Sequence, residues 1–390
     1  MAKPANWNGQ LRSNEIFAAI FNMIISQHVF ADNIKGTYSE LVDMMRTDGS
    51  LYGDTKLYYA VDVLHSEPWG ADAEAANLLN VYRPEAPEVQ AITIDQFRQI
   101  SLTVDNYLTK RAWSTEGAFS SFNSVMLGMI RDTKRIYDAT LFNSYIGTAE
   151  TSEGRQTIEV VLPIEEGNTE ATNRLRAQTI AAAIANLLVE LKDVTRDFND
   201  YGNMRSYSED DLIVVWNSEF VNEITKYDLP TIFHKEGLID KFGQHTLPAR
   251  YFGTIAGTSG TATASAANIS VRSLIETDYV VNGVTYHVFP GELIPGGATY
   301  NNVDAYNTNP NIICKIMHKR SVPFMSAMEV ATSFFNAKAL NETHYLTFGH
   351  NKPQYLYNYP YITLKAQSAE NDSDQGSDSD QGSDSEQGTE

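Results

Sequence analysis

The amino-acid sequence predicts an α+β fold in which long helices are combined with extended hairpins and returning strands. Two stretches, 114–147 and 172–202, carry apolar residues at helical spacing for about 30 residues each. Segments rich in β-branched and aromatic residues precede the first helix, lie between the two and follow the second. With 390 residues, 42% hydrophobic and 11% aromatic, the chain can bury a large core in one elaborate domain or in two or three.

The first segment, 1–48, predicts an N-terminal arm with one amphipathic helix. Ser13 or Asn14 can cap this helix, which runs to about Phe30. Asn22 interrupts the apolar stretch and no small-residue cleavage site follows, so an arm helix is favoured over a signal peptide. The helix has an apolar stripe that this chain or a neighbouring copy must cover: Phe17, Ile20, Phe21, Ile24 and His28.

The second segment, 49–96, predicts an extended hairpin. Gly53–Val63 reads as a strand, and the chain returns in a strand where Ile100, Leu102 and Val104 alternate with polar residues. The tip between them, His65–Gln90, is far longer than the usual loop of about 4–6 residues. Loops of this length tend to bind something or to lie on a neighbour.

The third segment, 97–165, is dominated by the helix at 114–147, which spans about 45 Å. Ser114 or Thr115 can cap it and Gly147 can end it. Its heptad-like spacing also permits a coiled coil, but threonines in the seam favour packing inside a mixed domain. Two rows follow this spacing: Phe119, Phe122, Met126, Met129, Thr133, Ile136 and Thr140, and beside them Ile130, Tyr137, Leu141 and Tyr145.

The segments 166–310 and 311–366 continue the mixed pattern. The first contains the second long helix, ended by Gly202, and then a strand and a helix within 211–227. Asn282-Gly283 predicts a tight hairpin turn, and the Gly/Ser/Thr/Ala-rich stretch 253–268 predicts a mobile surface loop. The second holds returning strands at 311–322 and 355–366. The second helix has one apolar row: Ile180, Ile184, Leu187, Leu191, Val194, Phe198 and Tyr201.

No pattern in the sequence nominates a catalytic, cofactor-binding or metal-binding residue. Cys314, alone in the chain, lies in an apolar stretch and is expected to be a buried thiol; His318 follows it but cannot be placed beside it. His344 and His350 could share a metal only with partners that the spacing does not identify. Gly257 and Gly260 lack the lysine of a phosphate-binding loop. We therefore expect no enzyme and no cofactor.

The charge is strongly negative throughout. The formal net charge is −20, and the residues from Glu370 onward hold eight acids and no base, so the body alone carries −12. An acidic body argues against a protein whose main task is to grip nucleic acid. The last segment, 367–390, predicts a disordered acidic tail, and its repeat does not fit a calcium-binding loop.

The order of these elements resembles the major capsid protein of tailed double-stranded DNA phages, with the Hong Kong ninety-seven fold. The matching stretches are YGDTKLYY and QAITIDQFRQISLTVDNYL for the extended hairpin (the E-loop), and MLGMIRDTKRIYDATLFNSYIG for the spine helix. The resemblance, over about Gln10–Ala366, implies an arm, an E-loop, a peripheral domain on the spine helix, an inserted axial domain and returning peripheral strands. The acidic body and short arm favour a small short-tailed phage.

The resemblance implies a protein that assembles with itself, as pentamers and hexamers, into an icosahedral or prolate head around double-stranded DNA. It also implies scaffolding and portal proteins as partners, proximity to DNA without specific binding, no membrane, and location in the virion after assembly in the host cytoplasm. The family's type member joins its subunits through an E-loop lysine, whereas the tip His65–Gln90 has none, so we expect a noncovalent shell. The arm is too short for a built-in scaffold segment, so we expect a separate scaffolding protein.

Three other classes remain open at this point, and the third is an enzyme, which would need a cleft with perturbed titratable groups. An encapsulin-type nanocompartment would share the fold, and a cargo enzyme encoded nearby would distinguish it. An exported surface-layer or adhesin subunit would suit the acidity and the 21 tyrosines, although the sequence has no credible export signal.

Overall fold

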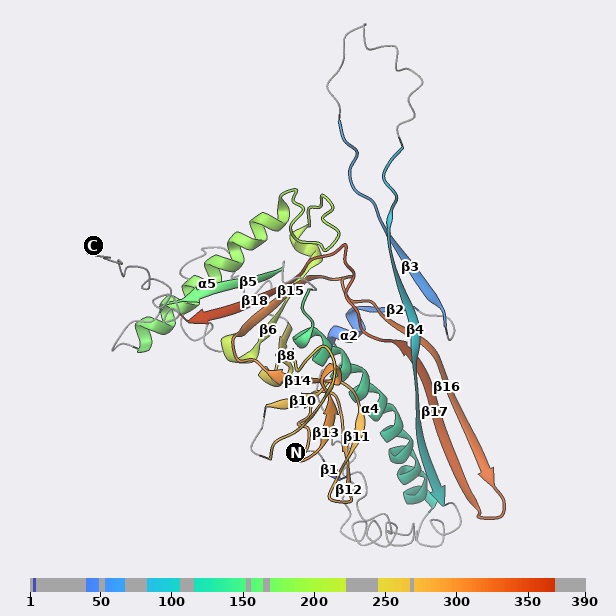
Figure 1. The fold of residues 1–390 in the computed structure, drawn as a ribbon. Helices are drawn as coiled ribbons and strands as arrows, with labels where there is room; N and C mark the ends of the chain where they lie inside the picture. The colour runs from blue at the N-terminus through green and yellow to red at the C-terminus, as the bar shows by residue number, and fades with distance from the viewer. Residues whose placement is uncertain are drawn as a thin grey trace, which may run out of the picture.

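The computed structural model describes residues 3–4, 40–48, 53–66, 83–105, 116–151, 156–163, 169–221, 245–266 and 270–368. The predicted arm helix, most of the hairpin tip and the acidic tail beyond Ser368 lie outside these residues. Within them, two five-stranded sheets, two long helices and a group of short strands make up the fold (Figure 1).

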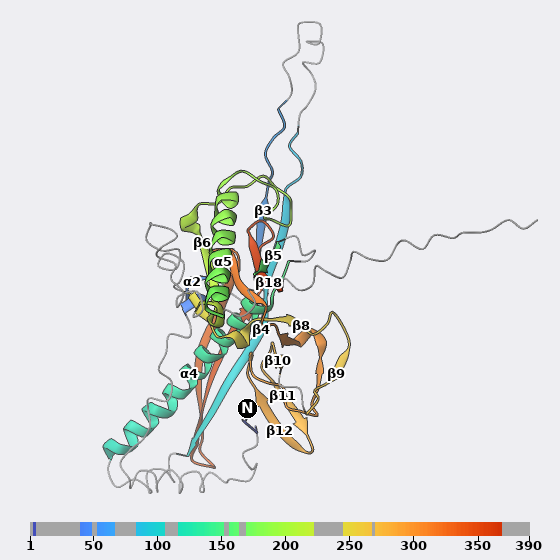
Figure 2. The ribbon, with the colours of Figure 1, turned by 90° about the vertical axis from the view of Figure 1, so that its left-hand side faces the viewer.

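Long strands form the first sheet, along which the helix α4 (Glu116–Thr148) runs (Figures 1 and 2). In sheet order the strands are β2 (Arg46–Asp48), β16 (Phe324–Asn336), β17 (Asn341–Asn351), β4 (Glu88–Asp105) and β3 (Thr55–Ala60). All neighbouring strands are antiparallel except β2 and β16. The β3–β4 hairpin extends away from the body at one end, and the β16–β17 hairpin reaches the other end (Figure 1). The short helix α2 (Glu40–Met44) precedes β2.

The prediction of the long helix at 114–147 is confirmed by α4, but its two halves differ in burial. In the second half Tyr137, Phe142 and Ile146 are all buried. In the first half Met129 is 54% exposed, whereas Ile130 is buried. The predicted row that contains Met129 therefore faces outward here, and the row that contains Ile130 faces the sheet.

The second sheet carries the other long helix, α5 (Thr169–Lys192), against one face (Figure 1). In sheet order its strands are β5 (Thr157–Leu162), β18 (Tyr361–Ser368), β15 (Ile312–His318), β6 (Leu212–Asn217) and β7 (His245–Leu247). The six-part division of the chain remains a prediction. The sheet crosses the predicted boundary at residue 310, because β15 and β18, which follow that residue, lie between β5 and β6, which precede it.

The second helix was predicted to run to Gly202, and this was wrong. Its row is buried at Ile180, Ile184 and Leu191, but α5 ends at Lys192. Asp193 accepts a hydrogen bond from the amide of Val194, and Thr195 pairs with Arg205 in an isolated bridge. These contacts turn the chain, because an acceptor side chain at this position offers the backbone a local alternative to the helix.

A group of short strands between residues 253 and 308, here called the inserted β unit, has its own small core. The expected turn at Asn282-Gly283 is confirmed, since both residues have positive φ, 51° and 77°. The strands of the inserted β unit are β8 (Gly253–Ile255), β9 (Thr261–Thr263), β10 (Val271–Ser273), β11 (Thr277–Val281), β12 (Val284–Val288), β13 (Thr299–Asn301) and β14 (Ala305–Thr308). The prediction that 253–268 forms a loop was wrong for two parts of it, because β8 pairs with β14 and β9 pairs with β13. The terminal strand β1 (Lys3–Pro4) pairs with β12.

Candidate assembly surfaces

The extended hairpin has one apolar face that the described part of the chain leaves exposed. Tyr59 on β3 pairs directly with Val89 on β4, and the two side chains are 64% and 48% exposed. Large apolar side chains at alternate positions continue this face along the strand and beyond it. We call this surface the hairpin ribbon; it consists of Leu57, Tyr59, Val61, Val63 and Val89. A contiguous exposed apolar surface of this kind is typical of a protein–protein contact.

The other face of the same hairpin is packed against the body. Ile92 and Ile94 are buried in a small cluster with Met325 and Leu356. Gln90 donates from Nε2 to the carbonyl oxygen of Tyr355 at 2.9 Å and accepts from the amide of Tyr357 at 2.9 Å. The hairpin is therefore anchored at its base with its apolar ribbon turned outward.

Asp62, two residues beyond β3, ties the hairpin to the loop that follows α5. Its carboxylate accepts a hydrogen bond from the amide of Met204 at 2.8 Å and pairs with Arg196 at 2.5 Å. Arg205 donates to the carbonyl oxygen of Val61 at 2.6 Å. The amide of Met204 and the guanidinium of Arg196 lower the pKa of Asp62 to about 2. This clamp fixes the direction in which the hairpin projects.

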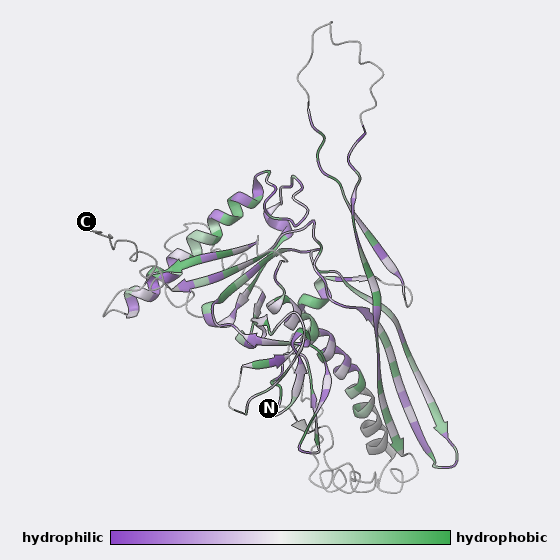
Figure 3. Cartoon of the chain, viewed as in Figure 1, coloured by the Kyte–Doolittle hydropathy of each residue, from purple (hydrophilic) through white to green (hydrophobic). Residues whose placement is uncertain are grey.

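The tip of the β16–β17 hairpin is a second exposed apolar surface. Phe334 and Phe335 are 64% and 51% exposed, and Leu340, with a φ of 56°, closes the turn at 43% exposed. Figure 3 shows this end of β16 as hydrophobic. Between this hairpin and α4 lies a groove of about 570 Å³, lined by residues that include Ile130, Glu329 and Leu346. Two projecting hairpins thus carry exposed apolar groups at opposite ends of the molecule.

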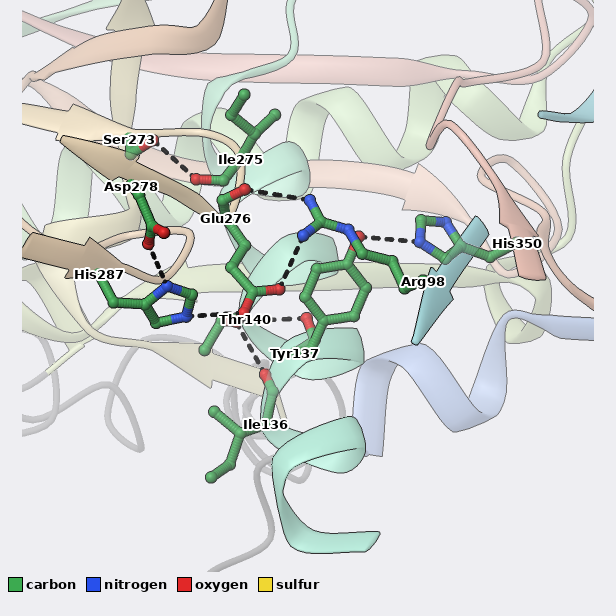
Figure 4. A network of polar contacts seen from close by, with 10 residues as sticks. All are labelled: Arg98, Ile136, Tyr137, Thr140, Ser273, Ile275, Glu276, Asp278, His287 and His350. Atoms are coloured by element: carbon green, nitrogen blue, oxygen red, sulfur yellow. Dashed lines mark hydrogen bonds and ion pairs between the residues drawn. The ribbon is translucent and has the colours of Figure 1, made fainter. Parts of the chain in front are cut away.

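A polar network joins the inserted β unit to β4 and α4 (Figure 4). Arg98 on β4 pairs with Glu276 at 3.1 Å, and its guanidinium lies 5.0 Å from the centre of the Tyr137 ring. The Tyr137 hydroxyl and His350 Nε2 are 2.9 Å apart. Burial lowers the pKa of His350 and raises that of Tyr137 to about 12, so both are neutral near neutral pH. This His350 contact holds α4 against β17.

The residues weighed as possible chemical sites are placed apart from one another. Cys314 is fully buried as expected, and burial raises the pKa of its thiol. His318 lies four residues away on β15, about 13 Å along the strand, and stacks on Tyr359. His344 lines the groove beside α4, whereas His350 bonds to Tyr137 and is also within hydrogen-bond distance of the Asn351 carbonyl oxygen.

Asn302 holds part of the Gly/Ser/Thr/Ala-rich stretch 253–268 in place through two hydrogen bonds. Asn302 donates from its amide to the carbonyl oxygen of Gly260 and from its side chain to that of Ser259. These contacts use carbonyl oxygens, whereas a phosphate site needs converging N–H donors. Among the described residues, no three histidine, cysteine or acidic side chains are placed to hold a metal ion. None of the described helices is both long and apolar enough to span a membrane.

The chain matches a known protein family in sequence and known structures in fold. Residues 5–353 match the sequence model of the family described as Phi29-like phage major capsid protein. No curated protein matches the chain. The fold is similar to a chain in the capsid structure of Staphylococcus phage Andhra, with a TM-score of 0.58, 10% identity and 87% of each chain covered. It is also similar to a chain in the structure of head fiber and inner core protein gp22 of native bacteriophage P68, with a TM-score of 0.54, 10% identity and 83% and 84% coverage.

Proposed function

Because the chain belongs to the family of Phi29-like phage major capsid proteins and has a Hong Kong ninety-seven-like fold, we propose that it assembles as pentamers and hexamers into a closed head around double-stranded DNA. The observation that carries this proposal is the pair of projecting hairpins, each with apolar side chains that the described part of the chain leaves exposed. Closed symmetric assembly would let one chain bury both surfaces repeatedly on its neighbours.

The chemistry of the described residues supports a structural role. Burial is the main cause of the pKa shifts of the buried groups Tyr145, Lys315 and Cys314. Asp62, partly buried and ion-paired, is a structural clamp. Family membership also favours a phage head over a nanocompartment or an exported surface layer, two of the alternatives that the sequence left open.

The accessory partners are part of the same proposal. A separate scaffolding protein would direct assembly and a portal protein would occupy one vertex, with assembly in the bacterial cytoplasm and the finished protein in the virion. Efficient formation of heads of uniform size from this chain alone would contradict the need for a scaffold. The net charge of −12 on the body is compatible with packaged DNA that is enclosed but not gripped.

We place the acidic tail on the outer surface of the head. Eight carboxylates per copy, inside a filled head, would face concentrated phosphate and repel it. Protease treatment of intact filled heads should therefore remove the tail. A tail that is resistant in filled heads and sensitive only after disruption would place it inside.

The double variant Tyr59→Ser/Val89→Ser tests the proposed assembly. It removes the paired centre of the hairpin ribbon, and because both side chains are exposed, the subunit should retain its fold and melting temperature. Negative-stain microscopy of the protein co-expressed with its genomic neighbours should show closed shells for the unaltered chain and few or none for the variant. The control Val280→Ser removes a 65% exposed apolar group from the inserted β unit and should leave shells unchanged. Equal shell yields from the double variant would contradict the proposal.

A further inference from the structure

The inserted β unit is attached to β4 through a series of ionisable groups (Figure 4). Arg98 donates two hydrogen bonds of 3.1 Å to Glu276, one to its carboxylate and one to its carbonyl oxygen. The second carboxylate oxygen of Glu276 lies 2.8 Å from Nε2 of His287. On the other side of the ring, Nδ1 lies 2.6 Å from the carboxylate of Asp278. The imidazole therefore stands between two carboxylates, one at each nitrogen.

We propose that His287 is the proton-dependent part of a latch that holds the inserted β unit to β4, closed when the ring carries both protons and loosened when it loses one. Only the doubly protonated ring can donate to Glu276 and Asp278 together. A neutral ring has one N–H donor, so one carboxylate would face a lone pair at hydrogen-bond distance. This latch is a property of the single subunit and does not rest on the proposed assembly.

The charges around His287 favour the closed form. Burial works against the ring's charge, but the hydrogen bond with Asp278 and the negative charge of Glu276 outweigh it, so the pKa of His287 is raised above 6.5. The stabilisation is therefore complete below pH 6.5 and is lost as the pH rises through the raised pKa.

The neighbours of the ring come from each packed element. Asp278 is its cross-strand partner on β11, and Glu276 precedes that strand. Phe289 packs edge-on at 5.0 Å. On the outer side of β12, Lys3 of β1 is paired with His287 through the backbone. Arg98 reaches the ring through Glu276.

Arg98 is the fixed side of the latch. Its guanidinium packs on the ring of Tyr137, which is itself held by His350, and its strand is paired with β17 along its length. The inserted β unit is the side with room to move, because a cavity of about 420 Å³ lies between it and α4. Ile255, Ile275 and Val303 line this cavity from the unit, and Leu141 and Tyr145 line it from the helix. Loosening the latch would let the unit shift against β4 across this cavity.

Hydrogen–deuterium exchange of the full-length subunit, corrected for the intrinsic pH dependence of exchange, tests the latch. Between pH 6 and 9, peptides covering 274–288 and 96–100 should lose protection by roughly tenfold, the change expected for one hydrogen bond to a charged group. His287→Gln should lack this step, because glutamine cannot take up the second proton. His344→Gln, on the groove beside α4, should keep it. A flat profile for the unaltered protein, or a preserved step in His287→Gln, would overturn the proposal.

A second variant keeps the test decisive if His287→Gln fails to fold. Asp278→Asn keeps the shape of the contact but removes one of the two negative charges that raise the pKa of His287. The midpoint of the exchange step should therefore move to lower pH. An unchanged midpoint would also overturn the proposal.

Discussion

The ammonium group of Lys315 donates a hydrogen bond to the carbonyl oxygen of Ala149, 2.9 Å away, directly after the last turn of α4. It also donates to the hydroxyl of Thr363 on β18 at 2.7 Å. Lys315 is fully buried on β15, so this contact joins the spine helix to the centre of the second sheet. Carbonyl groups at the end of a helix lack partners within the helix, and a donor from the sheet satisfies one of them.

We expect Lys315→Met to destabilise the subunit by about 1–3 kcal/mol, because it leaves the Ala149 carbonyl unpaired in the core. Burial lowers the pKa of Lys315 to about 7, with the charge of Glu150 opposing it. In the unfolded chain the lysine keeps its usual pKa of 10.5, so its contribution to folding becomes more favourable as the pH rises from 7 toward 10.5.

Denaturant unfolding at several pH values checks this prediction. The difference in unfolding free energy between wild type and Lys315→Met should grow from pH 7 to pH 9. The control is Lys338→Met, because Lys338 is exposed in the turn between β16 and β17. No such trend with pH is expected for this variant. A pH-independent difference for Lys315→Met would show that the lysine stays charged in the fold.

Gly147 in the last turn of α4 sets the distance between that helix and the segment 251–252, which leads into the inserted β unit. A Cβ at this position would lie 2.1 Å from the carbonyl oxygen of Tyr251. We expect Gly147→Ala to lower stability by about 1–3 kcal/mol through overpacking. Gly128→Ala, on the same helix with no atom within 4 Å, should raise it by about 0.5–1 kcal/mol. Thermal melts of the two variants should move in opposite directions, and a shared direction would contradict this packing argument.

The clamp at Asp62 should control the mobility of the extended hairpin. Asp62→Asn removes the charge that Arg196 pairs with, so limited proteolysis within 53–66 should become faster. Since the pKa of Asp62 is about 2, against 3.8 in its ordinary state, the clamp should be complete above pH 3.8 and be lost only as the pH falls toward 2. Glu88→Gln, on the paired strand of the same hairpin, is the control. Equal cleavage rates in the two variants would count against the clamp.

Phe334 and Phe335 should matter for assembly and not for folding. Both are more than half exposed, so replacing both with serine should change the unfolding free energy by no more than about 0.5 kcal/mol. Sedimentation of co-expressed protein should nevertheless show fewer closed shells, because the tip loses its apolar contact area. Val284→Ser, 41% exposed at the turn of the inserted β unit, should sediment like wild type. Full shell formation without the two phenylalanines would exclude the tip as a contact.

The assembled shell should be noncovalent. The hairpin tip His65–Gln90 has no lysine, so it cannot supply the amine for a side-chain cross-link. Boiled shells should run on a denaturing gel as one band at the monomer mass of 43.4 kDa. A ladder of higher bands would disprove this expectation.

Local patterns in the sequence determined much of the fold. The helix α4 is within two residues of its predicted bounds, and the turn at Asn282-Gly283 adopts the predicted conformation. Both depend on interactions between residues close in sequence: apolar side chains repeating at helical spacing, and a dipeptide that accepts positive φ. The buried state of Cys314 followed in the same way from its apolar neighbours.

Only the tertiary structure decided the features that depend on distant pairs. The long β16–β17 hairpin gave no clear alternation, because successive positions in the outer half of β16 are exposed. The end of α5 depends on Thr195 pairing with Arg205 across a turn, and the burial of Lys315 depends on the end of a helix more than 160 residues earlier in the chain. The latch at His287 likewise needs Arg98, which is on another sheet. Such contacts leave no local period in the sequence, because their partners are set by how strands pair and sheets pack.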